Sequence, residues 1–276
     1  MRDLSASIVI YKSNPDLLLH AINSFLKSAR VSLLYLIDNS PTDDARHLIT
    51  DPRIIYLFNN QNLGFGAGHN IALKAAMKSS SKYHLVLNPD VYFNEKVIPD
   101  LYQFMEEDHS IGLTMPKVLY PDGRLQPLCR LLPNPSMLFL RRFFRFHKKL
   151  LEKQNLAHEL HFSGYNKIMD VPFLSGCFMF LRVDALRQIG LFDERIFLYT
   201  EDMDLSRRIH QQFRTVFYPH ATIYHHHQRG SYHNVQLLFH NIKSAIRYFN
   251  KWGWFFDRER KIINQRTLLK LQNEFQ

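Results

Sequence analysis

The sequence predicts an α/β protein with a doubly wound, mostly parallel central sheet. Apolar strand-like segments alternate with helical segments over residues 1–90, and two of those strands end on an aspartate. Strands that alternate with helices form parallel βαβ units, and such sheets bind ligands beyond the carboxyl ends of their strands. With 276 residues and 46% hydrophobic composition, the chain can bury a core of that size.

Residue periodicity defines the alternating segments. Each strand is a short run rich in Val, Ile, Leu, Tyr or Phe, while the first helix repeats apolar residues at Leu18, Ile22 and Phe25. The predicted strands span 5–11, 31–38, 53–59 and 82–90, and the predicted helices span 15–29, 41–50 and 66–80. Asp38 and Asp90 therefore fall at strand ends, where a ligand is expected.

After residue 90 the regular alternation ends, and a smaller antiparallel part is expected. The helix that begins near residue 200 has Thr200 as its predicted N-cap and acids in its first turn. The expected elements are a helix over 94–108, a strand over 110–125 with a Pro-Asp-Gly turn, a strand and short helix over 170–190, a helix over 200–213, a strand pair or one bent strand over 215–227, and helices over 235–276.

Charge and composition restrict the function classes. The net charge of +10 favours a polyanionic partner, which could be nucleic acid, an anionic membrane surface or a phosphorylated ligand. Cys129 and Cys177 form no CxxC motif, so a reducing cytoplasm is expected. The sequence shows no signal-peptide core, and its longest apolar run is too short to span a bilayer. We therefore expect a cytoplasmic protein that is soluble or peripheral on the inner face of the cytoplasmic membrane.

The segment FLYTEDMDLSRR (197–208) places three carboxylates after an apolar stretch. On a helix, Asp202 shares a face with Leu205 and Ile209, which should point inward, whereas Asp204 can pair with Arg208. A carboxylate on that face, held ionised by the helix N-terminus, suits a general base. The alternative is that the acids only favour the start of the helix.

Two further segments could contribute to a metal site. Asn88-Pro89-Asp90 ends a strand, where hard oxygen ligands can hold a divalent metal against a diphosphate, although this sequence also forms an ordinary turn. In YHHH (224–227), strand alternation sends His225 and His227 to one face, and imidazoles can complete a metal site. With 15 histidines in the chain, either could equally be a surface or core residue.

A glycine-rich segment and two basic segments remain. NLGFGAGHN (62–70) opens a helix and lets backbone approach a ligand, but it matches neither the GxGxxG nor the Walker pattern, and packing is the alternative. Residues 141–153 and 241–261 each carry six Lys or Arg interleaved with aromatic residues. They suit an anionic membrane interface or nucleic acid, or they form ordinary solvated helix faces.

The order of these motifs resembles the family 2 glycosyltransferases, which are inverting enzymes of the GT-A fold. The resemblance covers about residues 5–235, is most specific over GLFDERIFLYTEDMDLSRR (190–208), and favours the bacterial rhamnosyltransferase-type members that build O-antigen or related surface polysaccharides. It implies a glycosyltransferase domain over 1–235, with a nucleotide-binding half at about 1–125 and an acceptor and catalytic half at about 126–235. A basic aromatic helical tail would follow over 236–276.

The resemblance also implies roles for individual residues. Asp202 would deprotonate the acceptor hydroxyl with Glu201 beside it, and Arg208 would orient their helix through Asp204. Asp90 and His225 would hold a divalent metal, Mg²⁺ or Mn²⁺, under the diphosphate, with His227 in reserve. The residues implied at the nucleotide are Tyr11, Asp38, Asn39, Gly66, Asn70 and Asn88.

Three departures from the family pattern narrow the expectation. Lys12 stands where many members carry Asn, and Asn88 replaces the first acid of the Asp-x-Asp metal motif, a variant that often accompanies deoxysugar donors. The Gln-x-x-Arg-Trp motif of processive synthases is missing. The resemblance therefore implies transfer of a single sugar, with rhamnose favoured, from a dTDP- or UDP-linked donor to a saccharide or lipid-linked acceptor.

Two other functions are possible on sequence grounds. A metal-dependent nuclease or phosphoesterase would use the same acids, histidines and basic tail, although the motif order disfavours nucleic acid as a partner. A dinucleotide-binding oxidoreductase is disfavoured, because the glycine loop follows the third strand and has the wrong spacing. The tail could bind an anionic membrane, pack on the core or form a homodimer contact.

Overall fold

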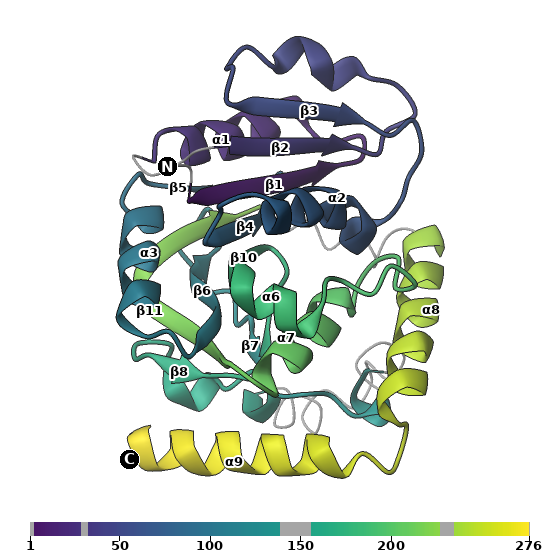
Figure 1. Ribbon diagram of the computed structural model, residues 1–276. Coiled ribbons are helices and arrows are strands. Elements are labelled where there is room, and N and C mark those ends of the chain that lie inside the picture. The colour runs from purple at the N-terminus through teal and green to yellow at the C-terminus, as the bar shows by residue number, and fades with distance from the viewer. Residues whose placement is uncertain (1–2, 29–32, 139–155, 227–234, 276) are drawn as a thin grey trace.

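A nine-stranded sheet forms the centre of the protein (Figure 1). The computed structural model describes residues 3–28, 33–138, 156–226 and 235–275. Along its main path the strand order is β3-β2-β1-β4-β10-β6-β11-β5, with β8 paired to β11, and β7 and β9 form a separate pair. The strands are β1 Leu4–Ile10, β2 Leu33–Asp38, β3 Ile54–Phe58, β4 Tyr83–Leu87, β5 Val91–Phe93, β6 Ile111–Leu119, β7 Cys129–Arg130, β8 Met169–Asp170, β9 Phe173–Leu174, β10 Phe178–Arg182 and β11 Arg214–His225.

The first four strands of that path are parallel, and the antiparallel pairs begin at β10. In the register of β1 and β2, Ile10 lies opposite Asp38, so both strands end at the same edge of the sheet. β10 runs antiparallel to both β4 and β6. The predicted parallel sheet with a smaller antiparallel part is therefore confirmed.

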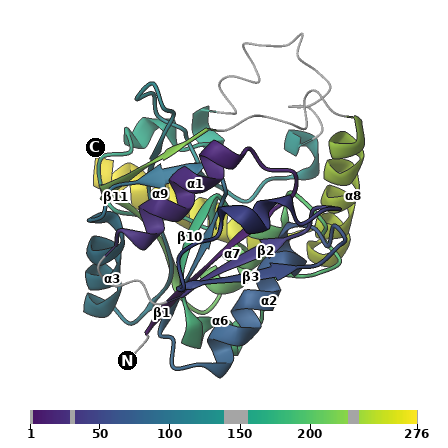
Figure 2. The same ribbon diagram turned by 90° about the horizontal axis from the view of Figure 1, so that it is seen from above.

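Helices cover both faces of this sheet. Figure 2 shows α1 on one side of β1–β3 and α2 on the other, which is the doubly wound arrangement. Asn14 caps α1 by accepting hydrogen bonds from the Asp16 and Leu17 amides. The helices are α1 Pro15–Leu26, α2 Phe65–Lys78, α3 Val97–Glu107, α6 Val183–Ile189, α7 Glu201–His210, α8 Val235–Trp252 and α9 Arg258–Phe275, with 3₁₀ turns η1 Asp44–Leu48 and η2 His161–Ser163.

Two local predictions differ from the structure, and a choice between two alternatives is decided. The helix expected over 41–50 is only the 3₁₀ turn η1. Of a strand pair or one bent strand, the structure has a single strand, β11, whose pairing with β6 shifts between Tyr218 and Thr222. Thr200 occupies the cap position of α7, but its side chain makes no capping hydrogen bond.

The centre of the sheet contains a small polar cluster within an apolar core. Ser7 Oγ lies 2.7 Å from His69 Nδ1 and 2.8 Å from His84 Nε2, and Ser5 Oγ lies 2.8 Å from His84 Nδ1. Burial lowers the pKa of His84 to about 3 and places that of His69 well below its ordinary value. Both rings are therefore neutral core residues.

The C-terminal helices pack against the rest of the chain. In Figure 1, α8 runs beside α7, and α9 crosses below the sheet. A second hydrophobic cluster joins α8 to β9 and α7 through Phe173, Met203, Tyr248 and Phe249. Of the roles considered for the tail, packing on the core is therefore realised.

Candidate active site

Two adjoining hollows lie at the carboxyl edge of the parallel strands. One, of about 390 Å³, extends from Asp38 towards η1, and the other, of about 330 Å³, extends from Tyr11 to Asp90. Lys12 and Ser13 line both hollows. Because β1 has β2 on one side and β4 on the other, this edge is the switch point of the sheet, where α/β proteins bind ligands.

Asp38 and Asn39 lie at the end of β2, beside the first hollow. Asp38 is fully buried and accepts hydrogen bonds from the Tyr56 hydroxyl at 2.6 Å and the Ser40 amide at 2.8 Å. Asn39 uses its side chain within the protein, donating to the Gly64 carbonyl and accepting from Asn59. Asp38 is thus held rigidly on the wall of the hollow, whereas the Asn39 amide stabilises the loops behind it.

Tyr11 and Lys12 follow β1 directly. Tyr11 is 49% exposed, so its ring is available to a planar ligand. Lys12 has a φ of 50°, which is uncommon for a residue other than glycine, and its amide donates to Ser40 Oγ at 2.9 Å. The turn fixed in this way places Lys12 on the wall of both hollows, where an ammonium group can meet a phosphate.

Asp90 and His225 meet where β4 and β11 end. His225 Nε2 lies 3.4 Å from Asp90 Oδ1, and His225 Nδ1 lies 3.0 Å from Gln126 Oε1. The Gln126 amide nitrogen donates to the carbonyls of His225 and Leu119, which turns its Oε1 towards the ring. Nδ1 therefore carries a proton and donates it to Gln126, while Nε2 faces Asp90.

This arrangement fits a divalent cation. The carboxylate and imidazole are suitable ligands for Mn²⁺ or Mg²⁺, and an outer amide that orients the ring is typical of metal-binding histidines. In the free protein burial lowers the pKa of His225, but Cys177 and Asp90 raise it more, to about 10, so a cation that binds Nε2 must displace the proton there. Within the part of the chain that the structure describes, no three His, Cys, Asp or Glu side chains form a metal-binding group, so a bound diphosphate would have to complete the coordination. His227 lies outside the described residues.

Asp202 lies at the start of α7, against the loop that precedes β10. Its Oδ2 accepts the Gly176 amide and its Oδ1 accepts the Met203 amide, both at 2.8 Å. The same loop receives the Asn88 amide at the Cys177 carbonyl, 2.9 Å away, so this short loop connects the Asp202 carboxylate to the strand end before Asp90. Burial raises the pKa of Asp202, while the two amides lower it.

Glu201 and Asp204 flank this carboxylate but point into the protein. Glu201 is buried, its Oε2 has no hydrogen-bond partner among the described residues, and burial and the Asp202 charge raise its pKa well above the ordinary value. Asp204 is fully buried and pairs with Arg208 at 2.9 Å, as the spacing predicts. Leu205 is also fully buried, as expected of the inward face.

The backbone before α7 is unusual. Tyr199 and Thr200 have φ values of 70° and 54°, and each such residue costs about 1–3 kcal/mol. Thr200 Oγ1 is buried without a hydrogen-bond partner among the described residues. Strain next to a candidate base indicates that the surrounding structure must hold this turn in place.

The glycine-rich loop packs closely against the segment that contains Phe192. A Cβ at Gly66 would lie 2.9 Å from Phe192 Cβ, so a side chain there would need Phe192 to move. Asn70 is buried and exchanges hydrogen bonds with the backbone of Phe192 and with Glu194. Gly66 and Asn70 therefore fix the loop over 191–195 onto α2, and their expected place near the nucleotide stays a prediction.

The family description "Glycosyl transferase family 2" matches residues 5–190, which is more than half of the chain. The chain belongs to glycosyl transferase family 2. It is 25% identical over 212 residues to the low-salt glycan biosynthesis hexosyltransferase Agl10 of Haloferax volcanii, covering 76% of this chain and 62% of the relative. It is 26% identical over 235 residues to the N-acetylglucosaminyl-diphospho-decaprenol L-rhamnosyltransferase of Mycobacterium tuberculosis, covering 77% and 72% of the two chains.

Two solved structures share the fold of this family 2 chain. GalNAc-T7 with UDP, GalNAc and Mn²⁺ superposes with a TM-score of 0.67 at 15% identity, over 90% of this chain and 48% of the other. TarS of S. aureus superposes with a TM-score of 0.54 at 15% identity, over 93% and 44%. The fold is therefore GT-A, as the sequence predicted. This chain spans less than two thirds of the length of its Haloferax relative and about half of GalNAc-T7.

The fold brings most of the predicted site residues of this family 2 chain to one edge. Tyr11, Asn88 and Asp90 line one hollow, Asp38 lines the other, and the loop at 175–177 joins Asp202 to them. Asn39, Gly66 and Asn70 lie behind the hollows. The basic segment 141–153 falls largely outside the described residues.

Sequence reasoning missed four contributors. Lys12 was noted only as a departure from the family pattern, and nothing in the local sequence pointed to Tyr56 or Gln126. Gly176 could have been identified, because a glycine before a buried strand often marks a close backbone approach. No helix in the described part of this family 2 chain combines the length and apolar character that crossing a bilayer requires.

Proposed function

We propose that this family 2 chain is an inverting glycosyltransferase that moves one sugar from a nucleoside diphosphate donor to an acceptor hydroxyl. The observation that carries the proposal is the position of the Asp202 carboxylate. Burial raises its pKa, and the backbone amides of Gly176 and Met203 hold it against the loop that also bonds Asn88. A base with a raised pKa, held by the loop that also bonds Asn88 on the wall of a hollow, suits removal of a hydroxyl proton.

The donor would extend across both hollows, with its nucleotide base at Asp38 and its diphosphate towards Asp90. Asp38 would accept hydrogen bonds from the nucleotide base, and Tyr11 would lie against it. Lys12 sits between the hollows, where its ammonium can pair with the diphosphate. Asp90 and His225 would hold a divalent cation, whose chemistry there is to stabilise the charge of the departing nucleoside diphosphate.

Asp202 would take the proton of the acceptor hydroxyl as that oxygen attacks the anomeric carbon. The bond to the diphosphate breaks on the opposite side, so a single displacement inverts the configuration. Glu201 lies beside Asp202, and burial and the neighbouring carboxylate raise the pKa of Glu201 well above its ordinary value, which favours its neutral form and leaves the role of base to Asp202.

Rhamnose from a dTDP- or UDP-linked donor, and a lipid-linked saccharide acceptor, are the substrates that we propose. Support comes from the Asn88-Pro89-Asp90 variant and from the Mycobacterium relative, whose name specifies rhamnosyl transfer to a diphospho-decaprenol-linked sugar. The product would belong to a surface polysaccharide of the O-antigen or lipopolysaccharide type.

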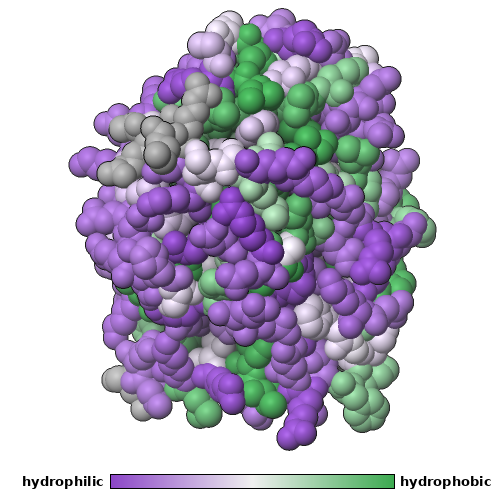
Figure 3. Space-filling view, in the orientation of Figure 1, coloured by the Kyte–Doolittle hydropathy of each residue, from purple (hydrophilic) through white to green (hydrophobic). Residues whose placement is uncertain are grey.

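We also propose that α8 and the turn after it attach the protein to an anionic membrane surface. Val235, Phe239 and Ile246 are exposed on one side of α8, and Phe255 and Phe256 are 74% and 100% exposed in the turn. Figure 3 shows hydrophobic side chains along the right edge and at the lower right, where α8 and this turn lie. Lys and Arg residues interleave with them, which favours anionic lipid as the occupant.

Because α8 and α9 contribute buried side chains, deleting the tail would unfold the protein, and point changes are the better test. The double variant Phe255→Ser with Phe256→Ser should bind vesicles of phosphatidylglycerol and phosphatidylcholine at least about fivefold more weakly than the unchanged protein. Equal vesicle binding by both proteins would overturn the membrane proposal, and loss of a protein dimer in solution would indicate a second copy instead.

The test of the enzyme is a panel of nucleotide sugars, each supplied with Mg²⁺, with Mn²⁺ or with a chelator. We expect release of nucleoside diphosphate from a dTDP- or UDP-linked sugar, faster with metal than with chelator. If no donor turns over, and the protein instead binds and cleaves DNA or RNA in a salt-sensitive way, it is a nuclease or phosphoesterase.

A further inference from the structure

The start of α7 needs support from outside the helix. Tyr199 and Thr200 hold left-handed backbone conformations, and the Thr200 side chain provides no cap. Such conformations persist only where surrounding contacts over-determine them. Asp202 follows directly, so whatever holds this turn also sets the position of the base.

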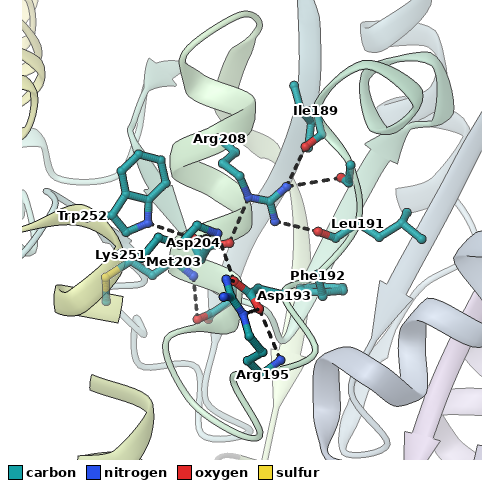
Figure 4. Close-up of polar contacts among 12 residues, drawn as sticks. Ile189, Leu191, Phe192, Asp193, Arg195, Met203, Asp204, Arg208, Lys251 and Trp252 are labelled. Carbon is teal, nitrogen blue, oxygen red and sulfur yellow. Dashed lines mark hydrogen bonds and ion pairs between the residues drawn. The ribbon is translucent and has the colours of Figure 1, made fainter. Parts of the chain in front are cut away.

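A buried carboxylate, Asp204, anchors that support (Figure 4). Its Oδ2 accepts Arg208 Nε at 2.9 Å, and its Oδ1 accepts both Lys251 Nζ at 2.7 Å and Trp252 Nε1 at 2.8 Å. Asp204 is fully buried, so these three donors satisfy a charge that water cannot reach. Two of the donors come from the end of α8, which is not part of the matched family region.

The same donors extend to the loop before α7. Arg208 also donates to the carbonyls of Ile189 and Leu191, at 2.9 Å and 2.7 Å, and Lys251 lies 3.2 Å from Asp193 Oδ2 (Figure 4). That loop is bonded in turn to Asn70 on α2, through the backbone of Phe192. The end of α8 is thus connected to both sides of the strained turn.

A second buried ion pair, three positions after Asp204, fixes α7 to the tail. Arg207 is 1% exposed and donates to both oxygens of Asp257, at 2.7 Å and 2.9 Å. Its guanidinium lies 4.0 Å from the centroid of the Trp252 ring. Trp252 therefore contacts α7 in two ways: its ring packs on Arg207 and its N–H donates to Asp204.

From this geometry we propose that Lys251 and Trp252 are positioning residues for catalysis, which act through Asp204 to hold the strained start of α7 and so aim Asp202. The helix α8 is then part of the catalytic apparatus, although none of its residues lines either hollow. This inference rests on the proposed function, because it concerns the base of that reaction.

The two tryptophans of the chain offer a matched pair of variants. Trp252→Phe removes the N–H that Asp204 accepts but keeps a ring against Arg207. Trp254→Phe is the control, because Trp254 Nε1 donates to the exposed side chain of Asn250, at 2.8 Å, and not to Asp204. Lys251→Met removes the cation, and Lys251→Arg restores one.

Each protein would be compared by kcat, by the KM of the donor and by the Kd of the nucleoside diphosphate. We expect about a tenfold fall in kcat for Trp252→Phe and a larger fall for Lys251→Met, with KM and Kd within about twofold. Lys251→Arg should recover most of the loss, and Trp254→Phe should match the unchanged protein. A role confined to stability would lower the melting temperature without changing kcat of the folded protein.

Hydrogen–deuterium exchange of amides 199–205 gives a readout that needs no activity. It should quicken at least about fivefold in Trp252→Phe and Lys251→Met but not in Trp254→Phe. Unchanged exchange together with unchanged kcat in both variants would overturn the inference, as would equal effects in Trp254→Phe. If the unchanged protein turns over no donor, the proposed function fails, and exchange alone decides whether the tail holds the turn.

Discussion

Buried polar side chains differ between two regions of the molecule. One is the proposed nucleotide side of the sheet, and the other is the junction between α7 and the C-terminal helices. At the centre of the sheet, the buried polar side chains of Ser7, His69 and His84 are neutral and hydrogen-bonded to one another. At the junction they are ions, since Arg207 and Asp204 are each at most 1% exposed. The charged groups of the nucleotide side face the hollows, where a ligand can meet them.

Because of this difference, single substitutions at the junction should lower stability, whereas substitutions at the hollows should lower activity. A buried ion that loses its partner keeps its desolvation penalty, so the junction should be sensitive to the removal of one charge. An exposed side chain on the wall of a hollow, such as Tyr11, should contribute little to folding, because its partner would be a substrate.

Removing a buried charge from the junction should destabilise the protein strongly. Arg207→Met leaves Asp257 buried without its bidentate partner, and we expect a loss of about 3–5 kcal/mol in the free energy of unfolding, measured with urea. Arg46→Met is the matched control, because Arg46 pairs with Asp43 on the surface. If the control loses as much stability as Arg207→Met, burial does not distinguish the two regions.

On the nucleotide side, removing the amide behind the metal pair should weaken metal binding, and it should also cost about 1–3 kcal/mol of stability because the Leu119 and His225 carbonyls lose their donor. Gln126→Leu frees the His225 ring, and we expect the concentration of Mn²⁺ needed for half-maximal activity to rise about 10–100-fold. Binding of the metal alone, followed by calorimetry, should weaken in parallel. An unaltered metal response would mean that His225 is no ligand.

A methyl group beside Asp202 should lower activity more than stability. In Gly176→Ala the new Cβ would lie 3.0 Å from Asp202 Cβ and 3.3 Å from its Oδ2, so the carboxylate must shift, and we expect kcat to fall about tenfold. Gly112→Ala creates a similar clash, 2.8 Å from Ile209 Cγ2, away from both hollows. It should cost about 1–3 kcal/mol of stability and leave kcat of the folded protein unchanged. The reverse pattern would contradict the placement of the base.

The smallest expected effect is a pH-dependent gain in stability. Burial and the Asp202 charge raise the pKa of Glu201 above its ordinary 4.5, so the wild type loses stability as the pH rises from about 4.5 towards that raised value. Glu201→Gln cannot ionise and should be more stable at pH 7, with the difference vanishing below pH 4. Asp257 behaves oppositely, because Arg207 helps lower its pKa, and its contribution is lost on acidification. A stability difference that is constant with pH would contradict this assignment.

The sequence predicted the elements whose residues lie close together in the chain. The strand ends at Asp38 and Asp90, and the inward face of α7, follow from local periodicity. Contacts between distant residues were not predictable, such as Gln126 with His225, 99 positions apart, or Trp252 with Asp204, 48 positions apart. Thr200 occupies the predicted cap position of α7, but its backbone is left-handed where a capping residue is usually extended, and its side chain makes no capping hydrogen bond.

The most direct test of the central claim is transfer by Asp202→Asn with the donor that the panel identifies. The account predicts that kcat falls at least about 100-fold while the Kd of the nucleoside diphosphate stays within about threefold. Asp184→Asn, at an exposed carboxylate on α6, should transfer at the normal rate. Near-normal turnover by Asp202→Asn would contradict the assignment of this aspartate as the base.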